Sequence, residues 1–161
     1  NTSRKKGLQL MQWKKVNHIK NKVMTNEDKK LLLKDLCSRV CYNPKFTFGN
    51  NVYTLDGIVE RVNDEGDWVY CLHAKGIEPI EIELCRPYLF PLSSMTEEQK
   101  RELSQLGVSY CEYALHDDIR GLGIMVDEAY IFYEFCYKHH IDFLGLIEMG
   151  LATDATGLNI Y

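Results

Sequence analysis

The sequence predicts an α+β domain: an N-terminal helix, a four- to five-stranded antiparallel sheet that is curled or closed into a small SH3-like barrel, and a C-terminal helical part. This prediction rests on the spacing of apolar residues, which changes twice along the chain. Apolar residues recur at helical spacing up to about residue 40, then alternate with polar residues, and a capped helical pattern returns after residue 94. A chain of 161 residues with 45% hydrophobic residues can bury one core of ordinary size.

Charge is divided unevenly along the chain. Residues 1–23 contain no acidic residue and form a basic arm, whereas all 23 acidic residues belong to one predicted domain, residues 24–161. Its sheet part covers about 44–91 and its helical part about 94–150. Two interpretations of the arm stay open: it binds nucleic acid, or Met24 is the natural start and the arm is not native. The basic side chains that would contact phosphate are Arg4, Lys5, Lys6, Lys14 and Lys15.

The first predicted helix covers residues 26–40. Thr25 or Asn26 can cap it, and leucines recur at helical spacing behind that cap. The opposite face carries basic residues, which we expect to be solvated. These residues are Lys29, Lys30, Lys34 and Arg39.

Strands are predicted at residues 45–48, 52–62, 68–73 and 80–84, each antiparallel to the strand before it. Gly57 suggests a bend in the second strand. In the third strand, Trp68, Tyr70 and Leu72 share one face, because side chains alternate along a strand.

The string RPYLFPLSSMTEEQKREL joins the sheet to the helical part. Because proline lacks a ladder donor, Pro87 and Pro91 predict an edge or exit strand. Two overlapping capping boxes, at residues 94–97 and 96–99, can begin the next helix, which Gly107 ends.

Further helices are predicted at residues 127–140 and 143–149, the second capped by Asp142. Residues 152–161 are expected to be irregular, and residues 109–120 fit either class.

The same string, together with DFLGLIEMGLA at residues 142–152, resembles a family of small uncharacterised phage and mobile-element proteins of gut anaerobes. The resemblance covers residues 24–161. It implies an accessory protein of mobile DNA, in a bacterial host, and transfers no catalytic residue because the family has no assigned activity.

The chain is expected to be cytoplasmic and to cross no membrane, because it contains no apolar run of 18 residues or more and no signal-peptide pattern. Its cysteines are then more readily explained as reduced core thiols than as disulfides. They are Cys37, Cys41, Cys71, Cys85, Cys111 and Cys136.

One group of residues could hold a metal ion and support a metal-dependent hydrolase, since imidazole and carboxylate groups are ligands for catalytic metals. The spacing matches no known metal-binding pattern, and no cofactor is predicted. The candidate ligands are His116, Asp118, His139, His140 and Asp142.

Aromatic and acidic residues of the predicted sheet are interpreted as core side chains or as a surface for a protein partner. Carboxylates surround these aromatics, and a nucleic-acid groove needs positive potential. The candidate residues are Trp68, Tyr70, Tyr88, Glu81 and Glu83. The sequence therefore favours a non-enzymatic interaction protein of unknown oligomeric state, with a nucleic-acid-binding module and a metal-dependent hydrolase as alternatives.

Overall fold

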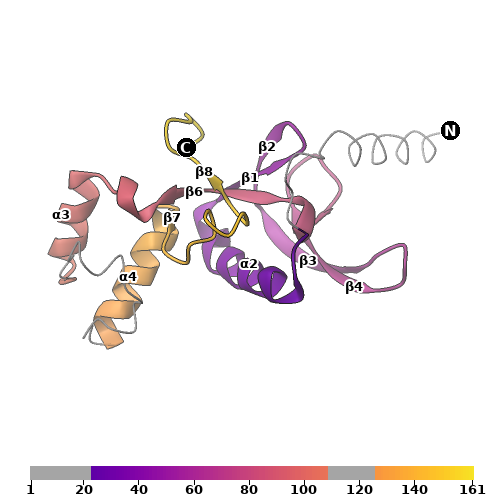
Figure 1. Cartoon of the computed structure of the whole chain (residues 1–161), viewed down its shortest axis with the longest axis horizontal. Coiled ribbons are helices and arrows are strands. Elements are labelled where there is room, and N and C mark those ends of the chain that lie inside the picture. Colours follow the sequence, from indigo (N-terminus) through magenta and orange to yellow (C-terminus); the bar gives the residue numbers. More distant parts are fainter. Residues whose placement is uncertain (1–22, 109–125) are drawn as a thin grey trace.

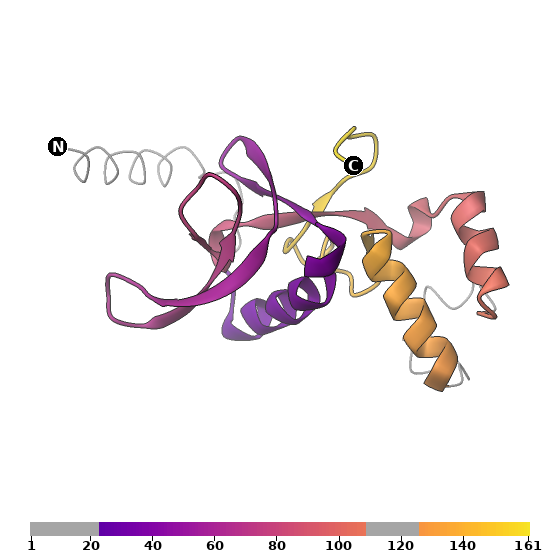
Figure 2. The ribbon, with the colours of Figure 1, turned by 180° about the vertical axis from the view of Figure 1, so that it is seen from behind.

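The computed structural model describes residues 23–108 and 126–161, and it has the predicted α+β organisation. The molecule is elongated (Figure 1), with the hairpin of β3 (Gly57–Val62) and β4 (Trp68–His73) at one end. The helices α3 (Glu97–Gln105) and α4 (Val126–Lys138) lie at the other end. Among the described residues, the strands form a five-stranded and a three-stranded sheet and no closed barrel. Figure 2 shows from behind how α2 (Asn26–Arg39) lies along the middle of the molecule.

The predicted first helix is confirmed as α2 (Asn26–Arg39). Thr25 caps it, because its hydroxyl accepts from the N–H of Asp28 at 3.1 Å while its own N–H donates to the Asp28 carboxylate at 3.0 Å. Leu32 and Leu36 are buried on the face toward the sheets. A 3-10 turn, η1 (Val40–Tyr42), extends the helix into the sheet region.

The predicted second strand is divided between the two sheets. β1 (Lys45–Phe48) pairs with β2 (Asn51–Thr54), whereas β3 (Gly57–Val62) pairs with β4 (Trp68–His73). The N–H of Leu55 donates to the carbonyl of Pro44 at 2.8 Å, and the next N–H, that of Asp56, donates to the carbonyl of His73 at 2.9 Å. The bend expected at Gly57 is therefore a change of sheet.

β6 (Arg86–Pro91) is a central strand, so the prediction of an edge or exit strand was wrong. It pairs antiparallel with β1, and parallel with β7 (Ile141–Asp142) and β8 (Thr153–Asp154). Each partner pairs with only two residues of β6. The two prolines lack an N–H, but each lies at the end of a ladder of only two residue pairs. Neither therefore interrupts a longer run of hydrogen bonds.

The two parallel partners of β6 also correct the prediction of a wholly antiparallel sheet. They come from the last 21 residues, so the tail expected to be irregular contributes β8. Tyr161 adds to this: its hydroxyl accepts from the N–H of Lys45 at 3.0 Å and donates to the carbonyl of Tyr88 at 2.8 Å. If the register of β1 and β6 continued, Lys45 would lie opposite Tyr88. The Tyr161 hydroxyl therefore links these two residues where the ladder no longer pairs them directly.

The helical part contains α3 (Glu97–Gln105) and α4 (Val126–Lys138). Of the two competing capping boxes, the structure uses Thr96 with Gln99, while the Ser94 hydroxyl donates to the carbonyl of Pro91.

The predicted helix at residues 143–149 was wrong, because this segment consists of turns. Gly145 takes a φ of 73°, which interrupts a helix, and the Asp142 carboxylate accepts from the N–H groups of Leu146 and Ile147 at 2.9 and 2.7 Å. Asp142 thus holds a compact loop instead of capping a helix.

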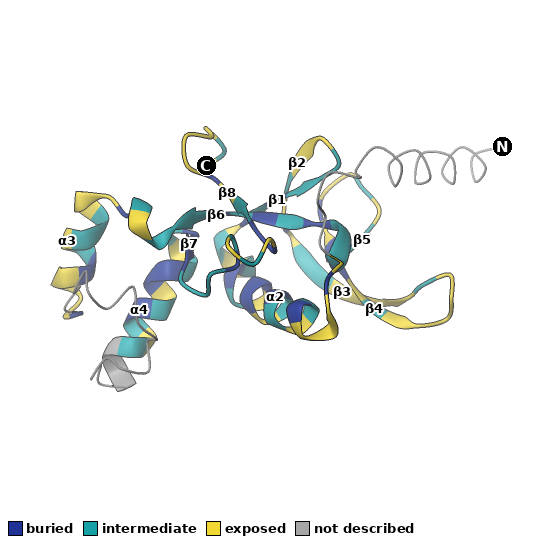
Figure 3. Ribbon diagram, in the orientation of Figure 1, coloured by how far each residue is buried: buried dark blue, intermediate teal, exposed yellow. Residues whose placement is uncertain are grey.

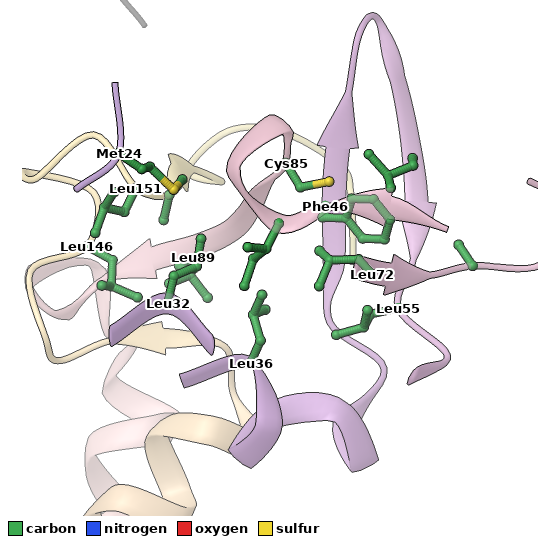
Figure 4. Close-up of a cluster of buried hydrophobic side chains, with 14 residues drawn as sticks. Met24, Leu32, Leu36, Phe46, Leu55, Leu72, Cys85, Leu89, Leu146 and Leu151 are labelled. Carbon is green, nitrogen blue, oxygen red and sulfur yellow. The ribbon is translucent and has the colours of Figure 1, made fainter. Parts of the chain in front are cut away.

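Two hydrophobic clusters stabilise the fold. The first joins α2 to both sheets and to the loop before β8, as Figure 4 shows for Leu36, Phe46, Leu72, Leu89 and Leu146. The second lies around α3, α4 and β7 and includes Leu103, Phe135 and Ile141. In Figure 3 the buried stripe of α2 faces the sheets, while the end of the β3–β4 hairpin is exposed.

Between these clusters lies a buried ion pair. Arg39, predicted to be solvated, is 0% exposed, and its guanidinium donates to both carboxylate oxygens of Asp35 at 2.8 and 2.9 Å. It also donates to the carbonyls of Cys136 and Ile141 at 3.1 and 2.9 Å. The solvated-face prediction was therefore wrong for Arg39, because Asp35 one turn earlier and two carbonyls from distant elements satisfy the charge inside the protein.

We expect Arg39→Met to lower the free energy of unfolding by about 3–5 kcal/mol, because it leaves the Asp35 charge buried without its partner. The double variant Asp35→Leu/Arg39→Met should recover part of that loss, since it removes both charges. Lys34→Met, at an exposed position of the same helix, is the control. Urea unfolding measures all of these, and a double variant less stable than the single one would contradict this account.

Candidate functional site

One face of β4 passes from the core to the surface. Leu72 is fully buried, whereas Tyr70 is 44% and Trp68 is 69% exposed. These side chains share a face because they alternate along the strand, and the buried end packs into the first cluster beside α2. Two large aromatic side chains are therefore held in a row by a strand whose other end is anchored in the core.

β4 also has an unpaired edge beside these aromatics. β5 (Ile80–Glu81) pairs with it only at Cys71 and Leu72. The chain then turns into the 3-10 helix η2 (Ile82–Leu84), so β5 does not continue alongside residues 68–70.

A groove of about 480 Å³ lies where β5 ends. One wall is the hairpin of β3 and β4, the other is the first two turns of α2, and β5 and η2 contribute the rest of the lining. Its lining is mixed, because Leu33 and Ile82 accompany lysines and carboxylates. We call this the β4 groove. Its charged members are Lys29, Lys30, Glu65, Asp67, Glu81 and Glu83.

Carboxylates outnumber lysines in this groove. Lys29 forms an ion pair with Glu83, and Lys30 is the other lysine of the lining, beside the carboxylates of the hairpin loop and β5. The loop that carries Glu65 and Asp67 is shaped by Asn63, whose side-chain oxygen accepts from both of their N–H groups at 3.0 and 2.8 Å. The backbone positions from which these two acidic side chains extend are thus set by a turn of defined shape.

Comparisons of the chain with protein-family models, with curated proteins and with solved structures found no match.

The structure brings together four of the five residues predicted to contact a partner. Trp68, Tyr70, Glu81 and Glu83 all line the β4 groove. Tyr88 does not, because it lies on β6 in the other sheet, where its carbonyl accepts from Tyr161. Sequence reasoning missed the contribution of α2, and a groove wall from a helix some forty residues earlier has no local sequence signal.

The candidate metal ligands that lie within the described residues interact with different groups and do not converge on one point. His139 lies 3.1 Å from Glu102, Asp142 binds two backbone N–H groups, and the His140 ring stacks on Tyr161 with centroids 4.1 Å apart. His116 and Asp118 lie outside the described residues, as do Arg4, Lys5, Lys6, Lys14 and Lys15 of the basic arm. Within residues 23–108 and 126–161, no three potential ligands form a group able to hold a metal ion.

The expectation of buried thiols holds for only part of the set. Cys71, Cys85 and Cys136 are buried and free, but Cys37 and Cys41 are exposed, so that prediction was wrong for these two. They lie on the side of α2 and η1 that no other described element covers, and Cys111 is outside the described residues. Burial raises the pKa of Cys85 and Cys136 to about 12, which keeps both thiols protonated and poor nucleophiles.

No helix in the described ranges has both the length and the apolar character needed to cross a bilayer.

His140 makes stability depend on pH. The residue is 9% exposed, and its Nδ1 has no hydrogen-bond partner. Burial lowers its pKa from 6.5 to about 4, helped by the nearby charges of Arg39, His139 and Lys45. As the pH falls, His140 is therefore protonated near pH 6.5 in the unfolded chain but only near pH 4 in the folded protein.

We expect the free energy of unfolding to fall by about 3 kcal/mol between pH 7 and pH 4 through His140 alone. His140→Asn removes the titrating ring and keeps a residue that tolerates the positive φ of 55° at this position, so it should flatten this part of the pH profile. The exposed His73→Asn is the control and should keep the slope of the unaltered protein. Urea unfolding over this pH range measures the effect, and equal slopes in both variants would contradict it.

Proposed function

We propose that the chain is a non-enzymatic accessory protein that binds a protein partner through the β4 groove. The exposed Trp68 and Tyr70, held side by side on β4 at the edge of the groove, are the observation that carries this proposal. Tyrosine and tryptophan are enriched at the centres of protein interfaces, where they supply much of the binding energy.

The chemistry of the groove favours a protein over the alternatives. Its carboxylates outnumber its lysines, which disfavours a phosphate backbone. Its described lining contains no histidine, cysteine or serine, the side chains that most often act as base and nucleophile in enzymes. An aromatic, acidic groove is better suited to basic and apolar groups of another protein.

The setting follows from the sequence resemblance. Similarity of residues 24–161 to phage and mobile-element proteins supports a role in the cytoplasm of a bacterial host carrying such an element. In that setting an accessory protein acts by binding a host or element protein, and the proposal requires no cofactor and no catalytic residue.

We expect Trp68→Ala to weaken partner binding by roughly thirtyfold, the effect of removing an aromatic anchor worth about 2 kcal/mol. Tyr130→Ala, which removes a 67% exposed aromatic from α4, is the matched control and should retain the partner. Affinity capture from host lysate with the three proteins, quantified by mass spectrometry, measures this. Thermal unfolding checks that both variants fold.

A partner captured equally by the unaltered protein and by Trp68→Ala would place binding elsewhere and contradict the proposal. So would turnover of a substrate by the purified protein without any partner.

A further inference from the structure

We propose that the β4 groove takes an extended, arginine-bearing segment of the partner, which adds as a new strand to the unpaired edge of β4 at residues 68–70. This inference rests on the proposed function and specifies what occupies the groove. Two independent features carry it: the backbone of β4 and the charges around it.

The backbone of β4 points hydrogen-bonding groups toward the groove, and β5 pairs with β4 only at Cys71 and Leu72. The N–H of Asn63 donates to the carbonyl of Asp67 at 2.8 Å, and His73 accepts from Asp56 on the same side, so the odd-numbered residues of β4 point toward β3. Because these groups alternate along an antiparallel strand, the N–H and C=O of Trp68 and Tyr70 point to the opposite side. That is the side on which β5 pairs with Leu72 and then ends.

An added strand is the natural occupant of such an edge. Extended peptides bind exposed strand edges by main-chain hydrogen bonds, and side-chain pockets then provide specificity. Here the place is already shaped, because the groove has β4 as one wall, α2 as the other and η2 at the end where β5 leaves the sheet. A segment in it would continue the line of β5, and the groove volume of about 480 Å³ lies in the range of sites that enclose ligands.

The side chains around this edge favour a positively charged side chain on the bound segment. Trp68 offers an exposed indole face, and guanidinium groups stack on such faces. Glu65, Asp67 and Glu81 lie around the same groove, and carboxylates bind arginine through two parallel hydrogen bonds. A lysine ammonium carries the same charge, but it can neither stack flat on the indole nor form two parallel hydrogen bonds to a carboxylate. Arginine should therefore be preferred.

The test uses the full chain and a fluorescent, capped peptide, Arg-Val-Arg-Val-Arg, with binding followed by anisotropy. We expect saturable binding that weakens as salt rises, weaker binding of the lysine analogue and no binding of the glutamate analogue. Trp68→Ala should weaken binding about fivefold, the effect of one cation–π contact, while Tyr130→Ala should not change it.

Backbone pairing is tested separately with two N-methylated peptides, one methylated at the arginine amides and the other at the valine amides. Only alternate amides of an added strand face β4, so one peptide should bind like its parent and the other should not bind. Equal effects in the two peptides would overturn strand addition.

Two further outcomes would overturn the inference: equal binding of the arginine and glutamate peptides, or binding of a peptide of residues 4–22 of this chain and not of the arginine probe. If Trp68→Ala still loses a partner from lysate while the peptides fail, the proposed function stands and this inference alone falls. If Trp68→Ala keeps its partner, the proposed function itself fails.

Discussion

The arrangement of this molecule depends on the buried guanidinium of Arg39. It neutralises Asp35 on its own helix and donates to the carbonyls of Cys136, near the end of α4, and Ile141, in β7. The last carbonyls of a helix have no partner within it and carry partial negative charge, so a fixed cation at this point satisfies them and favours the helix dipole. The Tyr137 ring covers the same charge, with its centroid 5.1 Å from the guanidinium carbon. One side chain therefore fixes the position of the second hydrophobic cluster relative to the first, at a desolvation cost that only a complete set of acceptors can offset.

This anchor explains how the groove is positioned. The C-terminal end of α2 is fixed by Arg39, and its middle is fixed by Leu32 and Leu36 in the first cluster. Its N-terminal turns, which carry Lys29 and Lys30, are then held beside the hairpin of β3 and β4 and form one wall of the groove. The hairpin itself extends beyond the clusters (Figure 3), so its aromatic row stays exposed while its base remains in the core.

Local patterns in the sequence were sufficient where local physics decides the structure. The cap at Thr25, the box of Thr96 with Gln99 and the alternation in β4 all depend on residues within four positions of one another. Sequence reasoning failed where distant partners decide. Arg39 looked like a surface cation because its carbonyl acceptors are about a hundred residues away, and Pro87 looked like an edge residue because the short parallel strands beside β6 come from the end of the chain. The candidate site shows the same division, since the row of Trp68 and Tyr70 could be predicted and the opposing helix could not.

The unpaired edge of β4 is itself a consequence of core packing. If residues 80–85 continued as a strand, Ile82 and Cys85 would point to opposite faces of the sheet, and one of them would be exposed. The 3-10 turn of η2, closed by the N–H of Cys85 donating to the carbonyl of Ile82 at 3.1 Å, brings positions three apart to the same side. Both side chains are then buried, at 4% and 0% exposure. Burying the second of these side chains stabilises the fold more than one or two solvent-accessible ladder hydrogen bonds would, so the strand ends early and leaves the edge of β4 uncovered next to its exposed aromatics.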